Sequence, residues 1–199
     1  MNRRQQIKNL VSGKIRDINY ALDYGDGKNI LANLRKGVGK EPGNIPEIFG
    51  TILEAMPEDF YSKNRIPTKE EWACYTALTL FSWHQQGFDL KKQPMHIDDG
   101  NGFGIALRRL AESYDDVNAK NRVLKKLHVI ISSTEITGFI YQLRNAITLL
   151  RGEGITLDYG LLAADIYDWQ YPDMKNSIGL KWGQDFFRNS FKEENKNEY

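Results

Sequence analysis

Hydrophobic residues along this chain recur with the period of amphipathic helices. In residues 103–110, Phe103, Ala106, Leu107 and Leu110 follow the i, i+3, i+4, i+7 pattern of one helical face. Segments that alternate polar and apolar residues between turn signals are missing. The pattern predicts a first helix ending near Gly25, then helices at 29–36, from Pro46, and at 69–86, 103–113, 117–131, 134–151, 158–169 and about 173–191. The sequence therefore predicts an all-α protein with about nine helices in two small bundles.

Capping residues mark several of the predicted helix starts. Thr68 and Glu71 have the spacing of a capping box at the start of the 69–86 helix. Asp158 precedes the 158–169 pattern as an N-cap, and Ser133 or Thr134 is expected to cap the helix at 134–151. These signals support the predicted boundaries independently of the hydrophobic period.

Glycine-rich segments divide the predicted helices. Gly37 follows the second helix, where we expect the left-handed conformation that glycine adopts readily. The polar, glycine-rich stretch 88–102 is predicted to be exposed or mobile. It is also the predicted boundary between an N-terminal helical domain, residues 1–95, and a C-terminal helical bundle, residues 96–199.

Charge is segregated along the chain although the total is nearly balanced. The 199 residues contain 27 Lys and Arg against 26 Asp and Glu, a formal net charge of +1. Residues 1–40 hold nine basic against three acidic residues, and residues 41–100 hold five against ten. Residues 101–151 hold eight against four, and residues 152–199 hold five against nine. Two basic zones thus alternate with two acidic ones, which favours either a local cationic surface or contacts between unlike faces of neighbouring subunits.

Within the second basic zone, cations gather on one face of a predicted helix. Arg122, Lys125 and Lys126 occupy i, i+3 and i+4 positions with no acid among them. Such a face lacks local salt-bridge partners, so we predict that it contacts phosphates. The aromatic-rich segments 72–83 and 182–187 could stack bases, but their helical spacing favours packing in the core.

Motifs for catalysis or metal binding are incomplete throughout. The segment Gly37-Val-Gly-Lys40 resembles the end of a phosphate loop, but Glu41 stands where the magnesium-binding hydroxyl belongs. His96 lies near two adjacent acids, which do not make a preorganised metal site. We predict no catalytic residue, no metal and no cofactor. The single cysteine, Cys74, suits a reducing cytoplasm, and no apolar run approaches the roughly 20 residues of a membrane span.

Short segments spread over most of the chain together resemble one family. They are Leu34-Arg-Lys-Gly37 with Pro42, Ile45-Pro-Glu-Ile-Phe49, Leu80-Phe-Ser-Trp-His84, Phe103-Gly-Ile-Ala-Leu-Arg-Arg-Leu110, Gln142-Leu-Arg144, Ile155-Thr-Leu-Asp-Tyr159, Leu161-Leu-Ala-Ala-Asp-Ile-Tyr-Asp-Trp169, Trp182 and Asp185-Phe-Phe187. In this order they resemble the CasB family, the small helical subunit of the type I-E CRISPR surveillance complex, Cascade. The chain departs from the family at Lys36, where arginine is usual, and at Phe49 and Tyr159, where tryptophan often occurs.

The resemblance implies a non-enzymatic subunit that is present in two copies along the inner curve of Cascade. Its expected partners are the other Cascade subunits, a second copy of itself, the guide crRNA and the target DNA, including the displaced strand; no membrane is involved. The candidate nucleic-acid-binding residues are Arg35, Lys36, Arg108, Arg109, Arg122, Lys125, Lys126 and Arg144. Some of these arginines could instead brace helices through acids such as Asp158 or Asp165. The main alternative is a protein–protein scaffold without direct nucleic-acid contact.

Overall fold

The computed structural model describes residues 2–116 and 118–188, and in these ranges the chain is helical. The helices are α1 (Arg3–Ala21), α2 (Gly27–Lys36), α3 (Phe49–Leu53), α4 (Lys69–His84), α5 (Phe103–Ser113), α6 (Ala119–Ile131), α7 (Ile136–Gly152), α8 (Tyr159–Trp169) and α9 (Pro172–Phe187). Within the described ranges there is no strand, only an isolated bridge between His96 and Leu157. The prediction of an all-α protein is confirmed.

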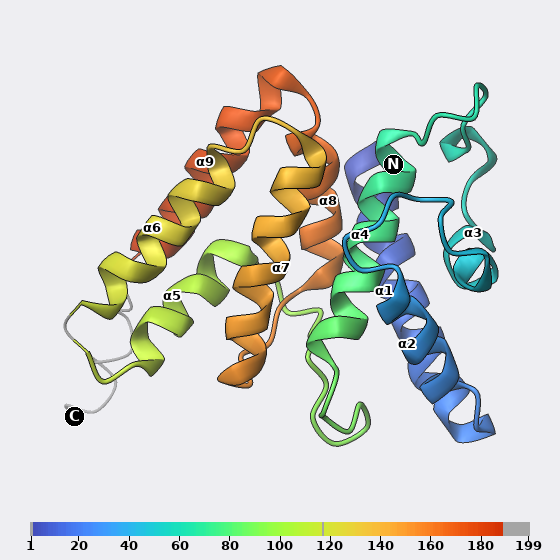
Figure 1. Cartoon of the computed structure of the whole chain (residues 1–199), viewed down its shortest axis with the longest axis horizontal. Helices are drawn as coiled ribbons and strands as arrows, with labels where there is room; N and C mark the ends of the chain where they lie inside the picture. Colours follow the sequence, from blue (N-terminus) through green and yellow to red (C-terminus); the bar gives the residue numbers. More distant parts are fainter. Residues whose placement is uncertain (1, 117, 189–199) are drawn as a thin grey trace.

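The helices are arranged around α7 and α8, which lie in the middle of the molecule (Figure 1). Helix α8 packs against α1 and α4 on one side and against α9 on the other. Helices α5, α6 and α9 pack on one another at one end of the molecule, and α1, α2, α3 and α4 form the other end (Figure 1). The middle helices therefore connect the basic α5–α6 region to the first half of the chain.

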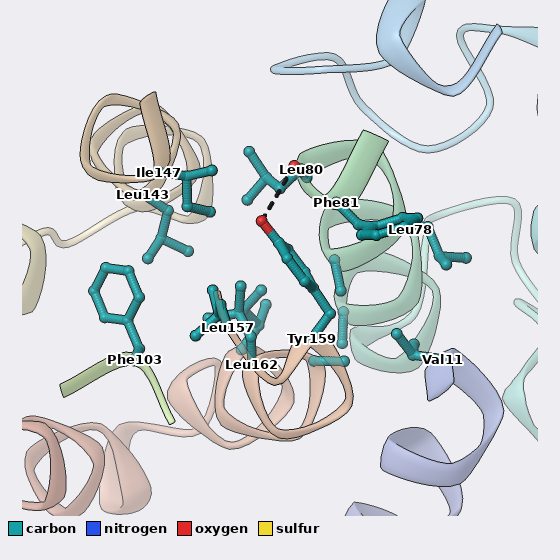
Figure 2. Packing of buried hydrophobic residues seen from close by; sticks show 14 of the residues in the cluster. Val11, Leu78, Leu80, Phe81, Phe103, Leu143, Ile147, Leu157, Tyr159 and Leu162 are labelled. Carbon is teal, nitrogen blue, oxygen red and sulfur yellow. Dashed lines mark hydrogen bonds between the residues drawn. The ribbon is translucent and has the colours of Figure 1, made fainter. Parts of the chain in front are cut away.

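One hydrophobic cluster contains residues from both predicted domains. Tyr159 at the start of α8 is buried, and its hydroxyl donates a hydrogen bond to the Leu80 carbonyl of α4 at 3.3 Å (Figure 2). Phe139 of α7 stacks on Trp169 of α8, with ring centroids 4.0 Å apart. The domain boundary at residue 95 stays a prediction.

The capping predictions are confirmed at two helices and wrong at a third. Thr68 and Glu71 form both hydrogen bonds of the capping box at α4, and the Asp158 carboxylate accepts from the Leu161 backbone N–H at α8. Helix α7 instead begins after Glu135, and neither Ser133 nor Thr134 caps it. The Ser133 hydroxyl donates to the carbonyl of Val129 at the end of α6.

Of the two glycine-related predictions, one is wrong and the other holds for most of its segment. Gly37 has a right-handed φ of −81°, so the left-handed prediction is wrong. A Cβ atom at this position would lie 2.7 Å from the Tyr75 hydroxyl, so glycine is required for the close approach of α2 to α4. Much of the 88–102 segment is exposed as predicted, at residues 89, 91–93 and 97–100, but Leu90 and Met95 within it are buried. Met95 is held on both sides, because its N–H donates to Gln85 and its carbonyl accepts from Leu157.

A buried carboxylate ties three helices together. Asp165 of α8 is 0% exposed and accepts hydrogen bonds from Arg4 of α1 and from Lys181 and Trp182 of α9. The Lys181 ammonium lies 2.8 Å and the Trp182 indole nitrogen 2.8 Å from the carboxylate. A buried charge is tolerated only when it is paired and hydrogen-bonded, so these contacts fix how α1 and α9 sit on α8.

His84, at the end of α4, is buried against Tyr159. Its Nδ1 lies 3.0 Å from the Tyr159 hydroxyl. Burial lowers the pKa of His84 to about 4, and the nearby Arg151 guanidinium contributes to this lowering. Burial also lowers the pKa of His96, which accepts a hydrogen bond from the Tyr159 backbone N–H. Both imidazoles are therefore neutral in the folded protein near neutral pH.

Replacing Asp165 with alanine is expected to destabilise the protein by about 3 kcal/mol, because Arg4, Lys181 and the Trp182 N–H lose their shared acceptor. Asp165→Asn should cost less, since an amide oxygen can still accept from Trp182. Urea unfolding monitored by circular dichroism measures both. The control is Asp115→Ala on the surface, expected within about 0.5 kcal/mol of wild type. A loss no larger than that of the control would contradict the role assigned to Asp165.

Stability is expected to fall in mild acid because of His84. Its pKa is lowered on folding, so the unfolded chain binds the proton more strongly. The stabilisation is therefore complete above pH 6.5 and is lost as the pH falls towards about 4, by about 3 kcal/mol. His84→Phe should flatten this part of the stability–pH curve, which is measured by urea unfolding over the range from pH 4 to pH 7. Parallel curves for wild type and His84→Phe would refute the assignment.

Candidate nucleic-acid interface

Helix α6 exposes the three cations that the sequence placed on one face. It buries Val123 and Leu127 on the opposite side, and this leaves Arg122, Lys125 and Lys126 exposed to solvent. Arg122 pairs with an acid that precedes the helix, Asp116. In the described part of the chain, Lys125 and Lys126 form no ion pair, so their ammonium groups are available to an anion.

The two adjacent arginines of α5 have different environments. Arg108 donates to the backbone carbonyl of Arg188 at the end of α9 and lies 3.7 Å from Glu112. Arg109 is exposed and pairs with no acid in the described ranges. Arg108 thus braces α5 against the end of α9, while Arg109 faces solvent.

Arg35 and Lys36 lie at the C-terminal end of α2, a helix that packs against α1 and α4. Arg35 lines a groove of about 580 Å³ beside the turn that follows α4. The lining also contains Lys28 and an ion pair between Lys91 and Asp23 at 2.9 Å. Partial burial lowers the pKa of Arg35. Lys36 is exposed, with its ammonium 3.7 Å from Glu47.

Arg144 of α7 stacks on an aromatic ring instead of pairing with an acid. Its Cζ atom lies 4.7 Å from the ring centroid of Trp83, at the end of α4. Arg151 lies 4.6 Å from the same centroid, and its Nη1 donates to the Trp83 carbonyl and to Gln86, each at 3.2 Å. Arg151 belongs to the second basic zone, but the sequence predicted no site for it. The aromatic residues of 72–83 were predicted to lie in the core, whereas Trp83 is only partly buried.

The fold brings part of the predicted set together. Helices α5, α6 and α7 pack on one another, so Arg109, Lys125, Lys126 and Arg144 belong to one helical region. Arg35 belongs to another region, but Gln86 connects the two. This glutamine lines the Arg35 groove and accepts the hydrogen bond from Arg151. Of the sequence-predicted residues, Lys36, Arg108 and Arg122 have acidic or carbonyl partners, and the others have no anionic partner among the residues described.

The comparisons with known proteins assign the chain to a family. The family model for the CRISPR-associated protein Cse2 matches residues 30–187, which is most of the chain. The chain belongs to the Cse2 family. No curated protein sequence matches it. The crystal structure of CasB from Thermobifida fusca is similar, with 30% sequence identity and a TM-score of 0.71, over 91% of this chain and 97% of that one.

A second Cse2-family structure shares the fold. The CRISPR-associated protein from Thermus thermophilus aligns with a TM-score of 0.63 at 16% identity, over 95% of this chain and 100% of that chain. In this Cse2 chain, residues 2–116 and 118–188 contain no group of three or more His, Cys, Asp or Glu that could hold a metal ion. No helix among those residues is long and apolar enough to cross a membrane.

Two adjacent arginines allow a matched test, because Arg108 holds α5 against the end of α9 and Arg109 faces solvent. Arg108→Ala is expected to lower the free energy of unfolding by about 1 kcal/mol, because the contacts with Glu112 and the Arg188 carbonyl are lost. Arg109→Ala should change it by less than about 0.5 kcal/mol. Chemical denaturation of the purified variants gives both values. Equal effects of the two substitutions would show that Arg108 is not a brace.

Proposed function

We propose that this protein is a non-catalytic small subunit of the type I-E CRISPR Cascade complex that stabilises the guide–target R-loop through a cationic surface on α5, α6 and α7. The observation that carries the proposal is the exposed pair Lys125 and Lys126, which has no acid partner in the described part of the chain. Arg109 of α5 and the stacked Arg144 of α7 are further cations on helices that pack against α6, and neither has an acid partner in the described ranges. Membership of the Cse2 family supplies the CRISPR context.

The physical requirements of an R-loop suit such a surface. Base pairing between guide RNA and target strand carries the sequence specificity, and the exchange of DNA pairs for hybrid pairs is nearly balanced in free energy. Contacts with phosphates are independent of sequence and shift this balance towards the open state. A subunit with unpaired surface cations therefore needs no base-reading group and no catalytic residue to stabilise the loop.

The proposal includes the partners of the protein. It acts in the cytoplasm with the other Cascade subunits, a second copy of itself, crRNA and target DNA. Its phosphate contacts are assigned to Arg35, Arg109, Lys125, Lys126 and Arg144. Arg108 and Arg122 contribute charge to the surface while holding their own partners, and Lys36, paired with Glu47, adds charge at the end of α2.

The second candidate function, a protein–protein scaffold, is favoured by an apolar groove between α6 and α9. The groove has a volume of about 410 Å³ and is lined by Leu124, Leu180 and Phe187 among others. Leu180 is 63% exposed and Phe187 52% exposed. Exposed apolar side chains gathered at one groove are typical of protein contacts. On this alternative, the charge zones and the groove serve subunit assembly and the lysines contact no phosphate.

The two candidate functions are separated by replacing Lys125 and Lys126 together with alanine. Assembled complexes with the double variant are expected to have a several-fold shorter R-loop lifetime on every target sequence, because the lost contacts are to phosphates. The dependence of log lifetime on log salt concentration should flatten by about one unit or slightly less for each lysine. Helical content should not change, since both side chains are exposed.

The matched control removes two other exposed lysines, Lys40 and Lys63, which lie outside α5–α9. This variant has the same loss of net charge and is expected to keep the wild-type lifetime and salt dependence. If both double variants behave like wild type, the lysines of α6 contact no nucleic acid and the scaffold function is favoured. If both shorten the lifetime equally, net charge matters and the α6 site does not.

A further inference from the structure

Trp83, Arg144 and Arg151 form a packed unit between α4 and α7. Arg144, Thr148 and Arg151 follow one another at spacings of four and three residues, which places them on one face of α7. Trp83 lies against this face, since its indole N–H donates to the Thr148 hydroxyl at 3.0 Å. The Thr148 hydroxyl in turn donates to the Arg144 carbonyl at 2.8 Å. The ring is thereby fixed beside both guanidinium groups.

The two guanidinium groups are held but not neutralised. Both lie close to the electron-rich indole, at 4.7 Å and 4.6 Å from its centroid, an arrangement that attracts cations. Arg151 uses Nη1 for the Trp83 carbonyl and Gln86, which leaves its Nε and Nη2 donors for another acceptor. Across residues 2–116 and 118–188, Arg144 and Arg151 pair with no carboxylate. Two like charges on one ring repel each other, so an anion that bridges them is favoured.

We infer that Trp83 is a positioning residue that holds Arg144 and Arg151 as a two-guanidinium clamp for a phosphodiester group of a nucleic-acid strand. This inference rests on the proposed function and adds to it a contact residue, Arg151, and a residue, Trp83, that acts through the arginines. Guanidinium forks match phosphate oxygens in geometry, and stacking fixes the plane of the fork before the ligand arrives.

A nucleic-acid strand is favoured as the anion because further cations lie on elements next to the clamp. Helix α6, with Lys125 and Lys126, packs on α7. On the other side, Gln86 contacts Arg151 and also lines the groove that contains Arg35. Cations without an acid partner among residues 2–116 and 118–188 thus lie on elements next to the clamp, as expected for a ligand with repeated phosphates.

The test uses assembled complexes with guide RNA and four single variants: Arg144→Ala, Arg151→Gln, Trp83→Leu and Trp83→Phe. R-loop lifetime is measured over a range of salt concentrations. Arg151→Gln should shorten the lifetime several-fold and flatten the log–log salt dependence by about one unit or slightly less. Trp83→Leu removes no charge, so it should shorten the lifetime with little change in the salt dependence. Trp83→Phe keeps an aromatic face and should recover most of the lifetime.

The double variant Trp83→Leu with Arg144→Ala separates positioning from a structural role. If the indole acts through Arg144, its loss should matter less once the arginine is gone, so the two effects should not add. Wild-type lifetime and salt dependence for Arg151→Gln, or additive effects of Trp83→Leu and Arg144→Ala, would overturn the inference. If Arg144→Ala shortens the lifetime in those cases, the proposed function stands without the clamp. If neither Arg144→Ala nor the Lys125/Lys126 double variant changes the lifetime, the clamp and the proposed function are both refuted.

Thermal unfolding of each variant is the folding control. Trp83→Leu removes a partly buried ring, and a lower melting temperature is expected. Lifetimes are therefore compared well below the lowest melting temperature, with equal subunit content in every complex. If complexes with the Trp83→Leu variant do not assemble, the inference is tested with the Arg151→Gln and Trp83→Phe variants. Wild-type lifetime in Arg151→Gln then refutes the clamp, and the expected loss in Arg151→Gln with recovery in Trp83→Phe supports it.

Discussion

The buried Asp165 carboxylate is the interaction on which the arrangement of this protein most depends. It lies in α8, between the first half of the chain and the α5–α9 end, and its donors come from α1 and α9. Because a carboxylate without water requires charged or hydrogen-bonding partners, Arg4 and Lys181 are committed to the interior contacts of the fold. The same need for partners divides all the cations of the chain into those that hold helices together and those that remain available.

This division explains how a chain with a net charge of +1 can present a cationic surface. Acids take up the positive charge of Arg4, Lys181 and Arg122 at defined places. Lys125 and Lys126 are left without acid partners in the described ranges, on a helix whose other face is buried. Because no acid in those ranges neutralises the two ammonium groups, they attract a polyanion, and this attraction weakens as the salt concentration rises. The positions of the ion pairs therefore determine the charge of this surface more than the net charge of the chain does.

The sequence predicted most features that depend on local signals, the cap of α7 excepted, and failed more often where the cause was tertiary. The capping box of Thr68 and the N-cap of Asp158 involve residues three positions apart, and both were found. Gly37 was expected to be left-handed, which is wrong, because glycine is needed there for the close approach of Tyr75, 38 residues away. Arg108 and Arg144 both fall in motifs of the CasB family. Only the structure shows that one contacts a backbone carbonyl and the other an indole ring.

Trp83 shows how a core-like pattern can support a surface function. Helical spacing favoured burial for the aromatic residues of α4, and the ring is indeed partly buried, but its position at the end of the helix allows two arginines to stack over it. A stacked guanidinium loses less conformational entropy on binding a phosphate than a free lysine side chain does. The lysines of α6 attract a strand from a distance, and this attraction is screened by salt. The stacked arginines, already fixed in position, would then hold the strand at short range, so the two parts of the surface complement each other.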